Sequence, residues 1–228
     1  MAVFLQLLDR FHIRGGDGPI IVSVTGQRLL ALLALRGSVS RSVVAGTLWP
    51  DVTENRAHGS LRTTLWRLHQ ADEGIVGSTM GALSLTSAVH VDVRSFTERA
   101  LRSLAGPDDH CLPMMLERGE LLPGWGEEWV VFERERLRQL RLHALEAMAA
   151  HLLERRQFAL ALEAALHCIR LEPLRESAHR AIVAVHLAEH NVHEALQHYG
   201  TFQELVRDEL AIEPSETFTA MVRPLMRR

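Results

Sequence analysis

The segment Ser40–Gln70 constrains the fold more than any other part of the sequence, because its pattern is that of two short helices in succession. Ser40 is a suitable N-cap for the first helix, since serine is among the preferred residues at that position. Pro50 is a suitable end, because proline disfavours helical backbone at the residue before it. The buried stripe of this first helix is predicted to consist of Val43, Val44 and Leu48.

The second helix of the pair is predicted to run from Thr53 to Gln70 and to have two different faces. Its inner stripe comprises Ala57, Leu61, Leu65 and Leu68. Its outer face carries Arg56, Gly59, Thr63, Trp66, Arg67 and Gln70, with Ser60 and Arg62 at the edges. Arginine reads guanine edges in the major groove of DNA and glutamine reads adenine, so this face is typical of DNA recognition. A plain solvated arginine face is the alternative interpretation.

Patterns on both sides of this segment predict a small sheet, a further helix and a hairpin. Three short strands are expected at Val3–Leu8, Phe11–Ile13 and Ile20–Val24. A helix is expected at Gln27–Arg36, ended by Gly37. A hairpin is expected from Ile75–Thr79 and Leu83–Thr86 around a Met80-Gly81 turn. A sheet, three helices and a terminal hairpin together make a winged helix-turn-helix.

The second half of the chain is predicted to be helical and contains an internal repeat. The sequence Phe158–Leu162 recurs as Val192–Leu196 at a spacing of 34 residues, which is the tetratricopeptide period. Pro173 and Pro214 follow the two units and would end a helix in each. Stacked helix pairs leave a concave surface suited to binding proteins. The predicted fold class is therefore mainly α with a small β component, an N-terminal winged helix-turn-helix followed by a tetratricopeptide-like α-helical domain.

Composition and charge are those of a globular protein of 228 residues, with 47% hydrophobic and 23% charged residues. All 25 basic residues are arginines. Residues 1–91 carry 8 arginines and 6 acidic residues, whereas residues 92–228 carry 17 and 22. The longest apolar run, Leu29–Leu35, is too short to span a bilayer, and the N-terminus lacks the features of a signal peptide. A soluble, cytoplasmic protein is expected.

No arrangement of residues predicts catalysis or a bound cofactor. The sequence contains no G-x-S-x-G motif, no zincin motif and no phosphate-binding loop, so the protein is not expected to be an enzyme and no cofactor is expected. His186 and His190 have i, i+4 spacing on one predicted helix, which is geometrically compatible with a surface metal site. Solvated surface histidines are the favoured interpretation, and no metal is expected.

Several stretches resemble one family of bacterial regulators. Val39–Trp49, Asn55-Arg-Ala57 and Leu61–Leu68 resemble the OmpR-type winged helix as it occurs in the SARP family of transcriptional activators. Leu121-Leu-Pro-Gly-Trp125 and the residues after Val91 resemble the bacterial transcriptional activation domain (BTAD) that follows it. The resemblance implies a winged-helix DNA-binding domain at 1–91 and a BTAD at 92–228, in the short form of the family that has no ATPase domain.

The resemblance also implies a function, a site and partners. The function implied is a sequence-specific activator that binds direct repeats in double-stranded DNA near a promoter and contacts RNA polymerase or its sigma factor. The implied DNA-binding residues are Arg56, Arg62, Thr63 and Arg67 on the recognition helix, with Arg41 on a phosphate. Asp51 and Glu54 are candidates for the polymerase contact, with compensation of helix N-terminal charge as the favoured alternative.

Three questions stay open at this point. The stretch Gly81–Leu85 lacks the arginine usual in the family's hairpin, which supports an alternative function as a protein-interaction adaptor with little DNA binding. Monomers could bind a direct repeat, or a homodimer could form through residues 92–228. Trp66 is the only tryptophan predicted to point outward, and packing against the hairpin or the second domain is favoured over a DNA contact.

Overall fold

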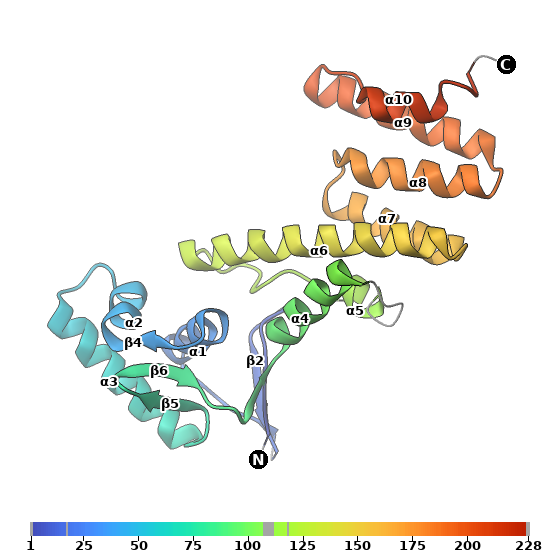
Figure 1. The fold of residues 1–228 in the computed structure, drawn as a ribbon. Helices are drawn as coiled ribbons and strands as arrows, with labels where there is room; N and C mark the ends of the chain where they lie inside the picture. The colour runs from blue at the N-terminus through green and yellow to red at the C-terminus, as the bar shows by residue number, and fades with distance from the viewer. Residues whose placement is uncertain (1, 17, 107–111, 118, 227–228) are drawn as a thin grey trace. The chain divides into compact units, whose positions relative to one another are not determined.

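The computed structural model describes residues 2–16, 18–106, 112–117 and 119–226 and contains two compact units. The first unit comprises Met1–Thr97 with Arg118–Glu135, and the second comprises Glu98–Glu117 with Arg136–Arg228. Figure 1 shows the strands confined to the first unit and the long helices prominent in the second. The fold is mainly α with a small β component, as the sequence predicts. The expected domain boundary after residue 91 stays a prediction.

The first sheet of unit 1 brings together strands that are distant in sequence. Its order is β3 (Gly18–Pro19), β2 (His12–Gly15), β1 (Val3–Gln6) and β7 (Val89–Val91). The pairing of β1 with β2 is antiparallel, whereas β1 and β7 are parallel with Val3 opposite Val89. Alternate residues of β1 are buried, which is the pattern of a sheet with one face on the core.

The predicted third strand at Ile20–Val24 is wrong. Helix α1 (Val24–Arg36) begins there instead, because the Ser23 hydroxyl accepts a hydrogen bond from the Gly26 amide at 3.3 Å and caps the helix. Ile21 is 91% exposed and has no core to pack against, so its β propensity has no effect. At the other end, Gly37 has φ of 75° and ends α1 as expected.

Helices α2 (Arg41–Leu48) and α3 (Glu54–Ala71) follow as predicted, with Ser40 and Thr53 at their N-caps. The Ser40 hydroxyl accepts a hydrogen bond from the Val43 amide at 3.4 Å. One detail of the predicted core is wrong, because Val43 is 49% exposed and Ala45 is buried in its place. The buried stripe of α2 is thus rotated by about one residue from the expected one.

The hairpin consists of β5 (Val76–Thr79) and β6 (Ala82–Leu85), and β4 (Val39–Ser40) adds to β6 in a second sheet. Met80 and Gly81 join the strands with φ of 51° and 80°. Positive φ at both central residues is the geometry of a type I′ turn, which matches the twist of a two-residue hairpin. The predicted hairpin is therefore confirmed.

A later segment of the chain also folds onto the first sheet. Leu8 forms a β-bridge with Leu121, and the Asp9 amide donates to the Glu120 carbonyl at 2.9 Å. A Cβ on Gly119 would come within 1.8 Å of the Asp9 carboxylate, so any other residue here would displace that side chain. The segment is held from its other side by Arg134, whose guanidinium donates to the carbonyl oxygens of Leu121, Leu122 and Trp125 at 2.7 to 3.0 Å.

The second unit contains α6 (Glu128–Glu154) from residue 136 on, α7 (Phe158–Leu171), α8 (Glu176–Ala188), α9 (Val192–Leu210) and α10 (Glu216–Val222). Helices α7 and α9 begin 34 residues apart, so the predicted repeat is confirmed. The turns before them are also alike, because Arg156 and His190 have φ of 59° and 63°. Even α6, at 27 residues, is not a membrane span, and no helix in the described ranges has the length and apolar character to be one.

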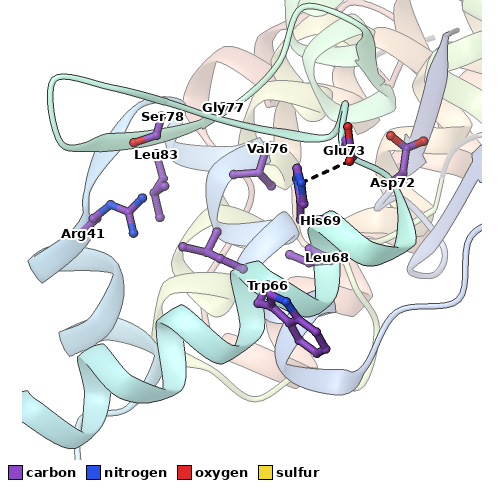
Figure 2. Close-up of a pocket in the computed structure, with 11 residues that line it drawn as sticks. Arg41, Trp66, Leu68, His69, Asp72, Glu73, Val76, Gly77, Ser78 and Leu83 are labelled. Atoms are coloured by element: carbon purple, nitrogen blue, oxygen red, sulfur yellow. Dashed lines mark ion pairs between the residues drawn. The ribbon is translucent and has the colours of Figure 1, made fainter.

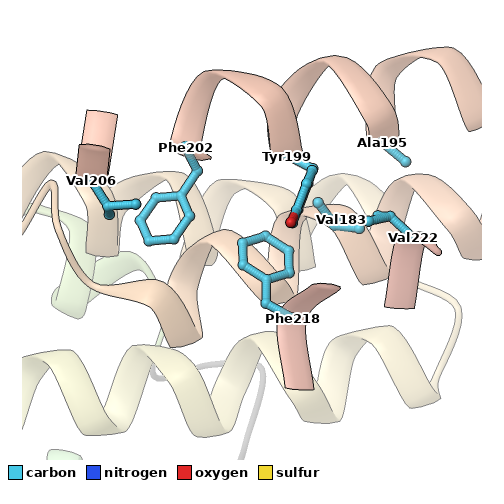
Figure 3. Close-up of a cluster of buried hydrophobic side chains, with 7 residues drawn as sticks. All are labelled: Val183, Ala195, Tyr199, Phe202, Val206, Phe218 and Val222. Carbon is cyan, nitrogen blue, oxygen red and sulfur yellow. The ribbon is translucent and has the colours of Figure 1, made fainter. Parts of the chain in front are cut away.

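An aromatic cluster fills the core between the last three helices, as Figure 3 shows. The cluster consists of Val183, Ala195, Tyr199, Phe202, Val206, Phe218 and Val222. The rings of Tyr199 and Phe218 meet edge to face with centroids 5.1 Å apart. The ring of His179 lies against Phe202 and, through Nδ1, within 3.0 Å of His198 Nε2. This cluster ties α8, α9 and α10 into one body.

Candidate nucleic-acid interface

The inner face of α3 anchors this helix in unit 1. Ala57, Leu61 and Leu68 are buried as predicted, and Leu65 is half-buried. Thr64 is also buried, and its hydroxyl donates to the Ser60 carbonyl at 2.9 Å, which satisfies the polar group without another element. A Cβ on Gly26 of α1 would lie 3.3 Å from Leu68, so α1 and α3 are in close contact. These contacts fix which side of α3 faces out.

The outer face of α3 presents the predicted DNA-binding residues to solvent. Arg56, Arg62, Thr63 and Arg67 are all exposed. The three guanidinium groups form no ion pair with any acidic group in the described part of the chain, so their charges are available to a ligand. The Thr63 hydroxyl donates to the Gly59 carbonyl at 3.2 Å, which leaves its oxygen lone pairs as acceptors.

Arg41 lies at the start of α2, next to the hairpin turn. Its amide is 3.4 Å from the Gly81 carbonyl, and Ser40 pairs with Ala82 of β6. The Arg41 side chain is half-buried and lines a hollow of about 440 Å³ together with Asn55, His58, Leu61 and Arg62. The structure therefore brings Arg41 and Arg62 to one hollow, whereas Arg56, Thr63 and Arg67 lie outside its lining.

A second hollow, of about 290 Å³, lies between the C-terminal half of α3 and the hairpin, as Figure 2 shows. Arg41 lines it as well, together with Trp66, Val76, Ser78 and Leu83. Its other lining residues include His69, Asp72 and Glu73, and His69 Nε2 lies 3.4 Å from a Glu73 oxygen. The residues directly after α3, Asp72 and Glu73, thus carry negative charge, while the middle of α3 carries positive charge.

Asn55 and His58 are the site residues that the sequence interpretation missed. They share a stripe with Arg62 at i, i+3 and i+7, adjacent to the predicted outer face, so helical spacing alone could have added them. His58 Nε2 lies 3.7 Å from Glu54, one turn earlier. An amide, an imidazole and two guanidinium groups around one hollow supply many hydrogen-bond donors, which suit phosphate or base edges.

Two residues of the outer face have no structural explanation within the fold. A Cβ on Gly59 would meet only the Arg62 guanidinium, at 4.0 Å, so no neighbour in the described chain requires glycine there. Trp66 is 62% exposed although tryptophan usually buries most of its surface. Figure 2 shows its ring projecting from α3 on the side away from the hairpin. The expected packing of Trp66 against the hairpin is therefore slight.

The described residues contain no group of three His, Cys, Asp or Glu side chains placed to hold a metal ion. His186 and His190, which the sequence places on one helix, do not share a helix face. Helix α8 ends at Ala188, and His190 lies in the turn after it with φ of 63°.

Comparisons with known proteins agree with this architecture. Residues 115–225 match the family model of the bacterial transcriptional activator domain. A solved structure of Mycobacterium tuberculosis EmbR in complex with a low affinity phosphopeptide is similar in fold, with a TM-score of 0.77 over 99% of this chain at 16% identity. The chain covers 65% of that EmbR chain. No protein with a curated description matches the sequence.

The family match agrees with the resemblance of the second half of the sequence to a bacterial transcriptional activation domain, and the fold agrees with the predicted winged helix. The matched residues include most of the helical repeats, and the fold before them is the winged helix of α1 to α3 and the hairpin. Residues 115–225 thus match a bacterial transcriptional activator domain, and the chain shares with EmbR the fold of a winged helix followed by a helical domain.

Proposed function

We propose that the chain is a sequence-specific activator that places α3 in the major groove of double-stranded DNA and reads bases with Arg62 and Arg67. The observation that carries the proposal is the outer face of α3, where three exposed arginines have no acidic partner in the described chain. A guanidinium can donate two hydrogen bonds to O6 and N7 of guanine. Arg56 and Thr63 extend the same face and serve bases or phosphates.

Arg41 contributes a phosphate contact in this proposal. It lies at the N-terminus of α2, where the helix dipole and free amides favour an anion. It also lines both hollows beside α3, one together with Arg62 and the other together with Ser78. A phosphate there would fix the register of α3 along the duplex without reading sequence.

Activation requires a partner in the transcription machinery, and the proposed partner is RNA polymerase or its sigma factor. Asp51 and Glu54 lie at the turn between α2 and α3 and are exposed. Acidic side chains at this turn could pair with a basic surface of the polymerase, in a cytoplasmic complex on promoter DNA. Tandem copies on a direct repeat, as monomers or as a homodimer, would present this turn repeatedly.

The test is selection of genomic DNA fragments by the purified full chain at fixed salt. The variant Arg62→Ala/Arg67→Ala is selected in parallel. The control is Arg99→Ala/Arg102→Ala, which makes the same change of charge on exposed residues of α4 (Asp92–Ala105). Enrichment of a short direct repeat by the wild type and the control, lost in the α3 variant, is the expected result. Equal enrichment by all three proteins would contradict base reading by α3.

A second candidate function is a protein-interaction adaptor, and the hairpin favours it. No arginine or lysine occurs between Val76 and Leu85, and Asp72 and Glu73 lie between α3 and the hairpin, so the hairpin contributes little attraction to phosphate. In this case the helical repeats would bind a protein partner through a concave surface. Absence of any enriched fragment at moderate salt would favour the adaptor over the activator.

A further inference from the structure

Trp66 is an exposed aromatic residue in the middle of the proposed reading face. It follows Arg62 by four positions and Thr63 by three, so the three side chains are neighbours on one side of α3. The residue is 62% exposed. Its ring makes no stacking or cation–π contact with the described residues, and its indole N–H has no hydrogen-bond partner among them. The fold of unit 1 therefore does not account for a tryptophan here.

Exposure of so large an apolar ring is costly unless a partner covers it. Tryptophan has up to about 250 Å² to bury, and each Å² of apolar surface removed from water contributes about 25 cal/mol. The neighbours of Trp66 on this face are polar or cationic, namely Arg62, Thr63, Arg67 and Gln70. A protein partner with an apolar surface would have to bury these arginines, whereas DNA neutralises them with its phosphates. The charges around Trp66 thus favour DNA as the occupant.

The major groove offers one apolar group to such a ring, the 5-methyl of thymine. We infer that Trp66 reads thymine by packing its indole against this methyl group, next to the base that Arg62 or Arg67 contacts. This inference rests on the proposed function, because it requires α3 to lie in the major groove. It adds a specificity-determining residue that acts without a hydrogen bond to the base.

The experiment removes the methyl group and the ring separately. Two duplexes carry the fragment most enriched by the wild-type protein, and they differ only in having thymidine or deoxyuridine at the tested positions. The replacement removes the 5-methyl group and keeps every hydrogen-bonding group of the base. Dissociation constants are measured at fixed salt for the full-length wild type, Trp66→Ala, Trp66→Phe and Phe132→Ala. Phe132 is a matched control, because it is 68% exposed in the same unit but lies outside α3.

Uracil is expected to weaken wild-type binding about fourfold for each methyl group that Trp66 covers. Trp66→Ala should bind the thymine duplex more weakly and lose the penalty for uracil, while Trp66→Phe and Phe132→Ala keep that penalty. Equal binding of both duplexes by the wild type overturns the inference, as does an unchanged penalty in Trp66→Ala. Equal binding of both duplexes is also the result expected if Trp66 packs only on a deoxyribose.

Two further outcomes separate this inference from the proposed function. If Trp66→Ala changes the sedimentation mass of the free protein and keeps the uracil penalty, the ring belongs to a protein contact and the inference fails while DNA binding stands. If the wild type binds no duplex at all, the proposed function fails, and the thymine contact fails with it. Thermal unfolding of Trp66→Ala should match the wild type, since an exposed substitution changes stability by about 0.5 kcal/mol or less.

Discussion

The guanidinium of Arg62 lies over Gly59, with Nη2 4.0 Å from the position that a Cβ on Gly59 would occupy. The two residues are three positions apart on α3, so the arginine covers the one place on this helix where the backbone has no side chain. Nothing else in the described chain fills that space. A glycine in mid-helix that the fold does not need suggests that a ligand needs it.

Gly59→Ala should stabilise the protein and weaken DNA binding. Alanine in a helix interior is favoured over glycine by about 1 kcal/mol, so the free energy of unfolding should rise by that amount in a urea titration. The added methyl group would obstruct a close approach of the duplex, so affinity for a selected fragment should fall.

Gly46→Ala is the matched control, because Gly46 is also inside a helix with open space around its Cα. It should gain similar stability and keep its DNA affinity. A Gly59→Ala protein with wild-type affinity would show that the duplex does not approach this point of α3.

Arg41→Ala should reduce the salt dependence of DNA binding rather than its sequence preference. Each phosphate contact contributes about one unit to the slope of log K against log salt concentration. The slope should therefore become shallower by about 1, with the same order of preference among fragments. Arg36→Ala, at the exposed end of α1, should leave the slope unchanged, and an unchanged slope in Arg41→Ala would remove the proposed phosphate contact.

Stability should fall as the pH drops below about 6.5, because two histidines are held neutral in the second unit. His179 Nε2 lies 2.8 Å from the Pro173 carbonyl, which can only accept, so this nitrogen carries the proton and Nδ1 accepts from His198 Nε2. Burial, then the proximity of His179 and His186, lowers the pKa of His198 from 6.5 to about 4. Burial also lowers the pKa of His179, against the opposing effects of Pro173 and Glu176.

Between pH 6.5, the ordinary pKa of histidine in the unfolded chain, and the lowered pKa in the native protein, the unfolded chain binds more protons than the native one. Unfolding is therefore favoured as the pH falls through that range. Urea midpoints measured from pH 7.5 down to pH 5 should decline for the wild type and decline less for His198→Gln. Parallel declines in both proteins would assign the effect to other groups.

Cys168 should be inert in the native protein. Burial, with a smaller contribution from Glu146, raises the pKa of its thiol to about 12, and its Sγ lies 3.8 Å from the Leu142 carbonyl. At pH 8 only about one molecule in ten thousand would carry the reactive thiolate. In a Cys111→Ser background, iodoacetamide should label Cys168 only after denaturation. Labelling of the native variant at the rate of a free cysteine would contradict this burial.

The elements that the sequence predicted well are those with a local signature. The Ser40 cap and the Met80-Gly81 turn each depend on residues close together in the chain. The repeat of α7 and α9 was found because the same short pattern occurs twice, 34 residues apart. The parallel pairing of β1 with β7 was not predicted, because Val3 and Val89 are 86 positions apart and no local pattern joins them. The start of α1 was missed although its signal is local. The Ser23 cap outweighs the β propensity of Ile20 to Val22.

The sequence predicted which side of α3 is exposed, but not the hollow that α3 forms with α2. Helical period alone placed Arg56, Arg62, Thr63 and Arg67 outside the core, and the structure agrees in their exposure. Their contact with DNA stays a prediction. The hollow that joins Arg41 to Arg62 depends on the positions of α2 and α3 relative to each other, which are set by tertiary contacts between these two helices.

The segment around Leu121 has a consequence for how this chain can be divided. The match to the family model spans residues 115–225, yet Arg118–Glu135 belongs to the same compact unit as the winged helix. A recombinant fragment cut before residue 118 would lose the partners of Leu8 and Asp9 at the edge of the first sheet, whereas one ending after Glu135 would keep them. The family match and the compact units therefore divide the chain at different places, and a stable fragment should follow the compact units.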